Sequence, residues 1–376
     1  MYVQFLIEDK STEKLVCHVM DKLKVCYSDK YIDYDTRAFK GIGHIPKKGT
    51  AIERKTGQLL NDLPMFLRAF DKKLRNLPGA VIIVVLDNDK RDHTEFQKQL
   101  KELSEQNNKQ IYDYVYETEG EEIKNFLGEI WEAMKESICF GLNAEGIIPG
   151  KLQLSKRAKS IYNNKIENEP TEVKRTRLLT AYAYAVSETN ASGGEIVTAP
   201  TCGSCGVLPA TLYYLQKEDK YTDEEIINAL ATAGIIGNIV KTNASISGAE
   251  CGCQAEIGTA CSMAAAACSQ LRKLDIYKIE HAAEIAMEHH LGLTCDPIYG
   301  YVQIPCIERN AVAAIRAIDA SNISMLLDEN QKISFDLITE TMYETGKDLR
   351  SHYRETSTGG LAKKYCRNKY YNTDME

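Results

Sequence analysis

The sequence predicts two domains of different class: an α/β domain with a parallel sheet over residues 1–106, followed by an all-α domain over residues 107–376. Three observations lead to this prediction. The chain has 376 residues, more than the roughly 100–200 residues typical of one domain. Strong strand signals are confined to its first part, and helical spacing dominates the rest. Its net charge changes from +3 over the first range to −10 over the second, which favours two joined modules.

Composition narrows the class of protein. Hydrophobic residues make up 44% and charged residues 26% of the chain, which excludes a disordered, collagenous or fibrous protein. No apolar run reaches the roughly 18 residues of a membrane span. Residues 1–15 lack the basic segment and the long apolar stretch of a signal peptide, so we expect a cytoplasmic protein. The acidic balance of residues 107–376 argues against nucleic-acid binding by that part.

In the first domain, two apolar segments predict strands. Tyr2–Ile7 is a short apolar run, and we expect a helix to follow it from about Ser11. Residues 80–86 are mostly β-branched and show no polar alternation, which is typical of a strand buried on both faces of a parallel sheet. A further helix is predicted over residues 94–103.

Acidic residues follow both predicted strands: Glu8 after the first, and Asp87 and Asp89 after the second. In open α/β sheets ligands bind beyond the C-terminal ends of the strands, so these carboxylates could share one Mg²⁺. The alternative is that they only cap helices and line solvated turns. Together with the Gly41–His44 loop, the pattern resembles the TOPRIM-like fold of nucleic-acid enzymes. The resemblance implies a metal-dependent module, and nucleic acid as a partner if that module is active.

The second domain, which follows a linker expected at residues 106–109, is predicted to be helical almost throughout. Apolar residues in the first predicted helix recur at the spacing of a helix with one buried face. A capping box at Thr222–Glu225 opens the third. The predicted helices cover Ile123–Ile138, Thr176–Thr189, Thr222–Asn238, Thr259–Leu271, Glu280–His290, Ala311–Asp319 and Phe335–Arg350.

A loop of small residues follows the second of these helices and includes Ser192, Gly193 and Gly194. Small residues let backbone N–H groups face a ligand, so this loop could form an anion-binding nest for a carboxylate. A tight turn between two helices is the alternative.

The next loop, residues 241–254, carries polar side chains at high density between two apolar helices. Buried polar groups must be paired, so a dense set in one place suggests a bound polar ligand. Asn243, Ser245 and Ser247 are the candidate ligand-binding residues in this loop.

Cysteines are concentrated in the second domain: nine of the twelve lie between residues 202 and 366. In a large chain without a signal peptide, we expect metal or cluster ligation by some of them and packing by the rest. Cys253, Cys295 and Cys306 are 42 and 11 residues apart, which matches neither a zinc ribbon nor a ferredoxin. Spacing alone therefore leaves packing as the simpler interpretation of each.

Longer motifs carry more information than cysteine spacing. They are Ser192–Thr201, Asn243–Gln254, Ala286–Pro297, Gln303–Asn310 and Glu355–Ala362. Over residues 112–366 they resemble the catalytic alpha part of the bacterial iron–sulfur L-serine dehydratases. The resemblance implies an all-α serine dehydratase alpha domain with a [4Fe–4S] cluster. It also implies a lyase that deaminates L-serine to pyruvate and ammonia, in amino-acid degradation and gluconeogenesis.

The resemblance also implies the ligand set. Cys253, Cys295 and Cys306 match the three cysteines that hold the cluster and leave one iron open to substrate. Cys366 is the candidate for a fourth cysteine that caps this iron at rest, although ten residues follow it where the family usually ends. Other cysteines match no family role, and we predict that they pack. These are Cys202, Cys205, Cys251, Cys261 and Cys268.

In the chemistry that the resemblance implies, an under-coordinated iron acts as a Lewis acid on the 3-hydroxyl of serine while a base removes the Cα proton. Lys241 and His289 are the candidate bases, and a helix C-terminal cap is the alternative for His289. The small-residue loop and the Asn243–Ser247 loop would hold the carboxylate and the amine of the substrate.

Single-chain members of this family begin with an α+β domain that carries a Ser-Ser-Ser-His-Thr motif, which this sequence lacks. We therefore expect impaired activity, with a homodimer or a separate β-type subunit as the assembly. Two other function classes stay open. One is a fusion or truncated protein that joins a TOPRIM-like nucleic-acid module to an inactive dehydratase scaffold. The other is a pyridoxal-phosphate deaminase, for which the sequence has no Ser-x-Lys-x-Arg-Gly run to supply the Schiff-base lysine.

Overall fold

The computed structural model describes residues 2–7, 20, 33–38, 81–85, 110–328 and 331–367. The chain divides into two compact units, residues 1–91 and residues 92–376. Each unit is described by itself below.

The first unit contains three short strands, β1 (Tyr2–Ile7), β2 (Asp33–Ala38) and β3 (Val81–Val85). They form a parallel sheet in the order β2-β1-β3, in which Val3 lies opposite Tyr34 on one side and Val81 on the other. The buried Phe5 packs edge-on against Tyr34, with 6.3 Å between the ring centroids.

The prediction of a TOPRIM-like α/β domain over residues 1–106 is wrong. Helices make up most of the described chain, and beside the three strands the described residues of the first unit include only one helical position, Met20. A TOPRIM-like α/β domain is therefore not found in the part of the chain that the structure describes. The sequence overestimated this domain because its two apolar segments indicate strands but not the helices that must cover them. Several predictions for this part lie outside the described residues: both of its helices, the Gly41–His44 loop, the linker at 106–109, and the possible Mg²⁺ ligands Glu8, Asp87 and Asp89.

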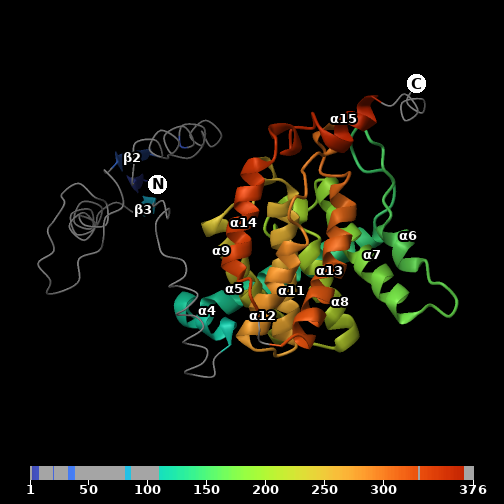
Figure 1. Cartoon of the computed structure of the whole chain (residues 1–376), viewed down its shortest axis with the longest axis horizontal. Coiled ribbons are helices and arrows are strands. Elements are labelled where there is room, and N and C mark those ends of the chain that lie inside the picture. Colours follow the sequence, from blue (N-terminus) through green and yellow to red (C-terminus); the bar gives the residue numbers. More distant parts are fainter. Residues whose placement is uncertain are drawn as a thin grey trace, which may run out of the picture. The chain divides into compact units, whose positions relative to one another are not determined.

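The second unit is all-α, as predicted (Figure 1). Its α-helices are α4 (Ile111–Glu119), α5 (Glu122–Asn143), α6 (Ala158–Asn163), α7 (Thr171–Ala191), α8 (Val207–Asp219), α9 (Asp223–Asn243), α10 (Gly248–Cys251), α11 (Thr259–Leu271), α12 (Ile276–Glu288), α13 (Cys306–Leu326), α14 (Phe335–Asp348) and α15 (Gly360–Arg367). Single turns of other helix types are η1 (Cys202–Ser204), η2 (Gln254–Gly258), η3 (Ile298–Gly300) and η4 (Ser351–Tyr353).

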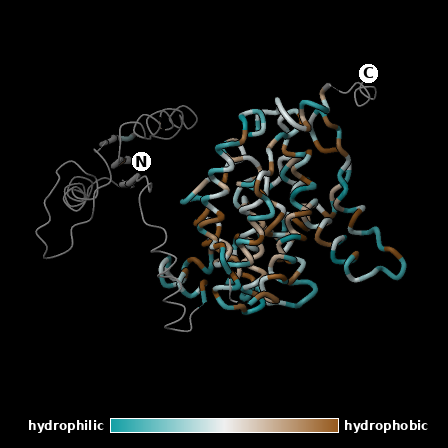
Figure 2. Tube along the Cα trace, viewed as in Figure 1, coloured by the Kyte–Doolittle hydropathy of each residue, from teal (hydrophilic) through white to brown (hydrophobic). Residues whose placement is uncertain are grey.

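Helix α11 forms the centre of the second unit. All of its residues are buried, and it packs against α8, α9, α12 and α13 (Figure 1). Most of these residues are alanine, serine or cysteine, and such small side chains let four neighbouring helices approach one central helix. Hydrophilic residues lie along the peripheral turns of the unit, which are teal in Figure 2. None of the described helices is both long and apolar enough to cross a membrane.

Two helix predictions are confirmed in detail. The predicted Thr259–Leu271 helix coincides with α11. The predicted capping box opens α9: the Thr222 hydroxyl accepts a hydrogen bond from the Glu225 backbone N–H at 3.3 Å, and the Glu225 carboxylate accepts one from the Thr222 N–H at 2.9 Å. These bonds pair two N–H groups that the first turn of a helix otherwise leaves free.

Candidate metal centre

Three separate segments bring buried thiols to one place. Cys253 lies between α10 and the π-helical turn η2, Cys295 lies in the loop after α12, and Cys306 is the first residue of α13. Their exposed fractions are 2%, 3% and 8%. Because η2 continues directly into α11, the central helix of the unit fixes the position of the Cys253 segment.

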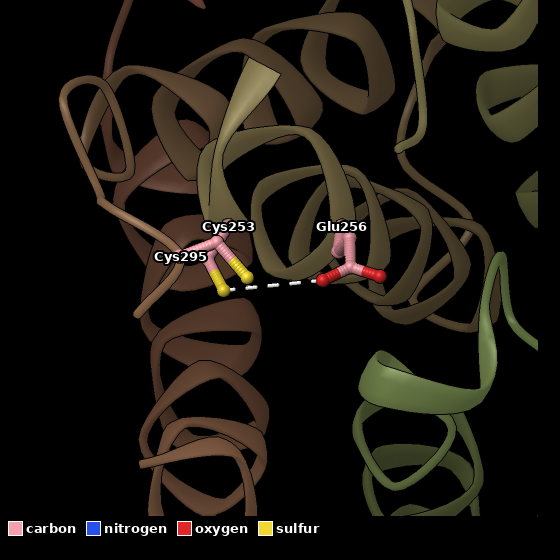
Figure 3. A group of neighbouring side chains, drawn as sticks. All are labelled: Cys253, Glu256 and Cys295. Carbon is pink, nitrogen blue, oxygen red and sulfur yellow. Dashed lines mark hydrogen bonds between the residues drawn. The ribbon is translucent and has the colours of Figure 1, made fainter. Parts of the chain in front are cut away.

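Cys253 and Cys295 form a tight group with a carboxylate, that of Glu256. The two Sγ atoms and one carboxylate oxygen all lie within 4.8 Å of one another (Figure 3). The Cys253 thiol donates a hydrogen bond to Glu256 Oε2 at 3.9 Å. Thiolate and carboxylate groups are metal ligands, and a set dominated by sulfur favours zinc or an iron–sulfur cluster over Mg²⁺ or Ca²⁺.

Cys306 lies outside this group but is influenced by the charges of two of its members. Burial, together with the negative charges of Cys253 and Glu256, raises the pKa of the Cys306 thiol. The hydrogen bond with Cys253 and burial raise the pKa of Cys295. Burial and neighbouring negative charge disfavour the charged forms of these thiols, and a bound metal cation reverses that preference because a coordinating thiol is deprotonated. The donor set therefore fits a sulfur-bound metal group.

Hydrogen bonds lock the Cys295 loop in place from two sides. The backbone of Cys295 pairs with the segment before α15: its N–H donates to Tyr353 O at 2.8 Å, and its carbonyl accepts from Glu355 N at 2.7 Å. On the other side, the buried Gln254 accepts a hydrogen bond from Gly292 N through Oε1 at 2.8 Å. Hydrogen bonds within the protein therefore hold both thiol segments.

The fully buried side chain of Asn310 fixes the Cys306 end of α13. Its Nδ2 donates to the carbonyls of Cys306 and Gly203 at 2.9 and 2.8 Å, and its Oδ1 accepts from Gly206 N at 2.8 Å. One amide thus ties the start of α13 to η1 and the start of α8. Buried amides of this kind stabilise a unique arrangement because an unmade hydrogen bond there costs free energy.

Glu256 is a site residue that reasoning from the sequence missed. It lies three residues after Cys253, and this spacing on a helical turn brings the two side chains to the same face. Thr201 Oγ1 donates a hydrogen bond to Glu256 Oε1 at 3.0 Å, and burial raises the pKa of the carboxyl. The Cys-x-x-Glu spacing was the signal that could have identified it.

The predicted anion nest is already occupied by the protein's own backbone. The N–H groups of Ser192, Gly193 and Gly194 donate to carbonyl groups in the last turn of α7, at 2.9–3.1 Å. Gly193 adopts φ +77°, a conformation that glycine tolerates and that is common where helices end. The hydroxyl of Ser192 is different, because it is buried and has no hydrogen-bond partner among the described residues.

The predicted polar loop lies next to the metal centre in sequence and in space. Asn243 ends α9, and Ser247 precedes α10, whose first residue, Gly248, borders both Glu256 and Cys295. The buried Ser245 donates through its hydroxyl to Glu250 Oε2 at 2.7 Å and accepts from Ser247 N at 3.1 Å. The Ser245 hydroxyl is thus used within the loop.

The two candidate bases and the candidate fourth cluster ligand have no hydrogen bond or ion pair with the three cysteines among the described residues. Lys241 is exposed in the last turn of α9. His289 directly follows α12, and its Nδ1 bonds to the carbonyl of Ile285 at 2.8 Å. Neither forms a hydrogen bond or ion pair with the three cysteines or Glu256, all of which the structure describes. Cys366 is exposed near the end of α15, beside Tyr299.

The chain resembles known proteins over most of its second unit. The family model for the serine dehydratase alpha chain matches residues 61–362. An L-serine dehydratase of Haemophilus influenzae is 48% identical over 250 residues, which cover 65% of this chain and 54% of that protein. L-serine dehydratase 2 of Escherichia coli is 47% identical over 251 residues, with the same coverage. An L-serine dehydratase of Helicobacter pylori is 45% identical over 277 residues, 71% of this chain and 60% of that protein.

The chain thus spans about half the length of the relatives it matches. The family match begins at residue 61, well inside the range predicted to be a separate TOPRIM-like domain. This start is a second reason to set aside that part of the predicted fold class. The alternative function built on it, a nucleic-acid module joined to an inactive scaffold, has no support in these comparisons.

Proposed function

The chain belongs to the serine dehydratase alpha-chain family, and from this premise we propose that it is the catalytic part of an L-serine ammonia-lyase. The proposed reaction removes ammonia from L-serine and yields pyruvate. One structural observation supports the proposal: two buried cysteines from separate segments, Cys253 and Cys295, form a tight group with Glu256 that could hold a metal.

We propose that Cys253, Cys295 and Cys306 bind a [4Fe–4S] cluster. The fit rests on the sulfur-rich donor set, on its burial, and on Gly248, which borders the group without a side chain. When bound, the cluster supplies a Lewis acid that helps the serine 3-hydroxyl to leave. The protein keeps this group away from water, since all three thiols are less than a tenth exposed.

The residues around the thiols orient the substrate in this proposal. Asn243 ends α9, and Ser245 and Ser247 lie in the loop from there to Gly248, which borders the thiol group; this neighbourhood supports a role for them in contacting a ligand. From the Ser192–Gly194 loop, the Ser192 hydroxyl is the group that has no other partner among the described residues. Hydrogen bonds from such groups can hold the carboxylate and the amine of serine.

Lys241 is the better of the two candidate bases for the Cα proton. It lies two residues before Asn243, and its exposed side chain has no hydrogen-bond or ion-pair partner among the described residues. His289 is less suited because Nδ1 is bonded to its own helix and its carbonyl accepts from Arg316 Nη1 at 2.9 Å. A second copy of the chain or a β-type subunit is the proposed assembly partner.

The proposal is tested with the full chain, reconstituted anaerobically with iron and sulfide. We expect about four irons and four sulfides per chain, and pyruvate formation from L-serine that depends on the cluster. Pyruvate is followed by coupled oxidation of NADH. Absence of bound iron after reconstitution would refute the cofactor, and a cluster-bound protein that forms no pyruvate with any partner chain would refute the reaction.

A further inference from the structure

The Glu256 carboxylate is built into the thiol site from both sides. Towards the thiols, a Cβ atom at Gly248 would lie 2.6 Å from Glu256 Oε2 and 3.1 Å from Cys295 Sγ. On the opposite side, a Cβ atom at Gly203 would lie 3.3 Å from Glu256 Oε1, and Thr201 Oγ1 bonds to that oxygen at 3.0 Å. The two glycines therefore leave room for the carboxylate, the Thr201 hydroxyl holds Oε1, and Oε2 lies among the thiols (Figure 3).

This carboxylate lacks a close cation. Within residues 110–328 and 331–367, no lysine, arginine or histidine forms an ion pair with Glu256, and Arg309 acts on it only at longer range. Glu355 adds a second negative charge nearby. A partly buried carboxylate is more costly than an exposed one unless a cation or a metal compensates its charge. The neighbouring thiols of Cys253 and Cys295 also become negatively charged when they bind a metal. A metal cation between these thiols and Glu256 would therefore compensate the charge of all three groups.

The alternative fourth ligand lies elsewhere. Cys366 is exposed near the end of α15, and α15 packs on η3 through an edge-on contact between Tyr365 and Tyr299, with 6.1 Å between ring centroids. Of the described residues, Glu256 shares the group of ligand atoms within 4.8 Å with Cys253 and Cys295. Cys306 lies outside that group but is influenced by the charges of Cys253 and Glu256, whereas Cys366 lies beside Tyr299.

We infer that Glu256 is an oxygen ligand of the metal centre and occupies the position that the three cysteines leave without a thiolate. This inference rests on the proposed function, because it assumes the cluster. A hard carboxylate oxygen is a poorer ligand for an iron–sulfur centre than a thiolate, so this position stays exchangeable. The iron at this position is therefore the first to be lost on oxidation.

The test compares cluster-loaded full-length chains: wild type, Glu256→Gln, Cys366→Ser and Glu355→Gln as the matched control. Glu355→Gln removes a neighbouring negative charge of the same kind without touching the group of ligand atoms. Each protein is treated anaerobically with ferricyanide. The readouts are iron and sulfide per chain and the electron paramagnetic resonance signal of the three-iron cluster that forms when one iron leaves.

We expect Glu256→Gln to form the three-iron cluster roughly tenfold faster than wild type, in line with the effect of losing a metal-supporting group. Glu355→Gln and Cys366→Ser should behave like wild type. Equal rates in all four proteins, or acceleration in Cys366→Ser alone, would overturn the inference while leaving the proposed function intact. A wild-type chain that binds no cluster would overturn both.

Two further variants keep the test decisive if Glu256→Gln fails to fold. Glu256→Asp retains the charge but shortens the reach, and Thr201→Val removes the hydroxyl that holds the carboxylate while leaving its charge. Each should form the three-iron cluster at a rate between that of wild type and the rate expected for Glu256→Gln. Wild-type rates in both would count against ligation by Glu256.

Discussion

Gly248 separates the thiol of Cys295 from the carboxylate of Glu256. A methyl group at this position would meet Glu256 Oε2 at 2.6 Å and Cys295 Sγ at 3.1 Å. We therefore predict that Gly248→Ala pushes these side chains apart and sharply lowers iron content after anaerobic reconstitution. The free energy of unfolding should fall by only about 1 kcal/mol, because the displaced atoms are the ends of side chains.

Gly234 is the matched control for this substitution. It also lies in a helix, α9, but a Cβ atom added at Gly234 would have no other atom within 4 Å. Gly234→Ala should keep full iron content and raise stability by about 0.5–1 kcal/mol, since glycine is unfavourable inside helices. Iron content and urea unfolding of both variants check the prediction, and a Gly248→Ala protein with full iron would show that the site is roomier than the structure indicates.

The cysteines give a second prediction at this scale. Cys253→Ser, Cys295→Ser and Cys306→Ser should each abolish stable cluster binding, because each removes one thiolate from a set of three. Iron and sulfide analysis measures this loss directly. If all three variants retained full iron, the ligand assignment would be wrong.

Two other cysteines provide the controls. Cys202→Ser and Cys205→Ser should keep the cluster, because these residues belong to η1 and its end and lie outside the group of ligand atoms. The buried Cys205 should instead show a packing loss: we expect Cys205→Ser to unfold at lower denaturant concentration than Cys202→Ser, whose side chain is exposed.

Long sequence motifs, rather than cysteine spacing, identified the candidate metal ligands. Spacing left Cys253, Cys295 and Cys306 as ordinary packing residues, and only the resemblance singled them out as ligands. Glu256 was missed because a glutamate beside an apolar helix is usually exposed. Its partial burial follows from the way η2 continues into α11, which is a property of the folded chain rather than of local sequence.

At the scale of single elements, α12 carries an acidic row of Glu280, Glu284 and Glu288. Burial, and then the charges of Glu288 and Glu280, raise the pKa of Glu284 to about 7. His281 Nε2 lies 3.7 Å from its carboxylate, but burial lowers the pKa of that imidazole, so it offers little positive charge at neutral pH. The folded state thus favours the protonated form of Glu284.

This shift predicts how stability depends on pH. The ordinary pKa of a glutamate is 4.5 and the pKa of Glu284 in the folded chain is about 7, so its contribution to stability is most favourable below about pH 4.5 and is lost as pH rises through 7. We predict that Glu284→Gln stabilises the protein by about 1–3 kcal/mol at pH 8, with a much smaller gain at pH 5. Urea unfolding at the two pH values measures the difference.

An exposed glutamate is the control for this change. Glu129 lies on the exposed face of α5, and Glu129→Gln should leave stability nearly unchanged at both pH values. A gain from Glu284→Gln of the same size at pH 5 and pH 8 would contradict the explanation by titration and point to packing instead.

Helix prediction succeeded where the local signals were strong. The capping box of α9 and the apolar run of α11 located those helices. Helix α8 was not predicted, because it starts in a stretch that contains Gly206 and Pro209, which usually interrupt helices. Pro209 lies in the first turn of α8, where a missing backbone N–H costs little, and the helix is then buried against α7 and α11. Tertiary packing thus outweighed the local sequence.

At the scale of the whole molecule, the all-α class of the second unit could be predicted because helical periodicity recurs over most of its length. The first unit could not, since two strand signals and three acids do not specify which elements cover a sheet. Burial of the thiol site could not be predicted either. It depends on α11, α13 and the segment before α15, which are distant in sequence and meet only in the folded chain.

The final prediction concerns the part of the relatives that this chain does not match. The chain spans about half of their length, and holding the serine carboxylate and amine requires groups beyond the thiol site. A misplacement of about 1 Å can slow a reaction about 100-fold. We therefore predict that the cluster-loaded chain alone turns over L-serine slowly, and that a β-type chain with a Ser-Ser-Ser-His-Thr motif raises the rate by roughly that factor. Steady-state pyruvate formation measures it, with the same partner bearing His→Ala in the motif as control. Full activity of the lone chain would mean that its own residues, among them Ser192 and Asn243, complete the site.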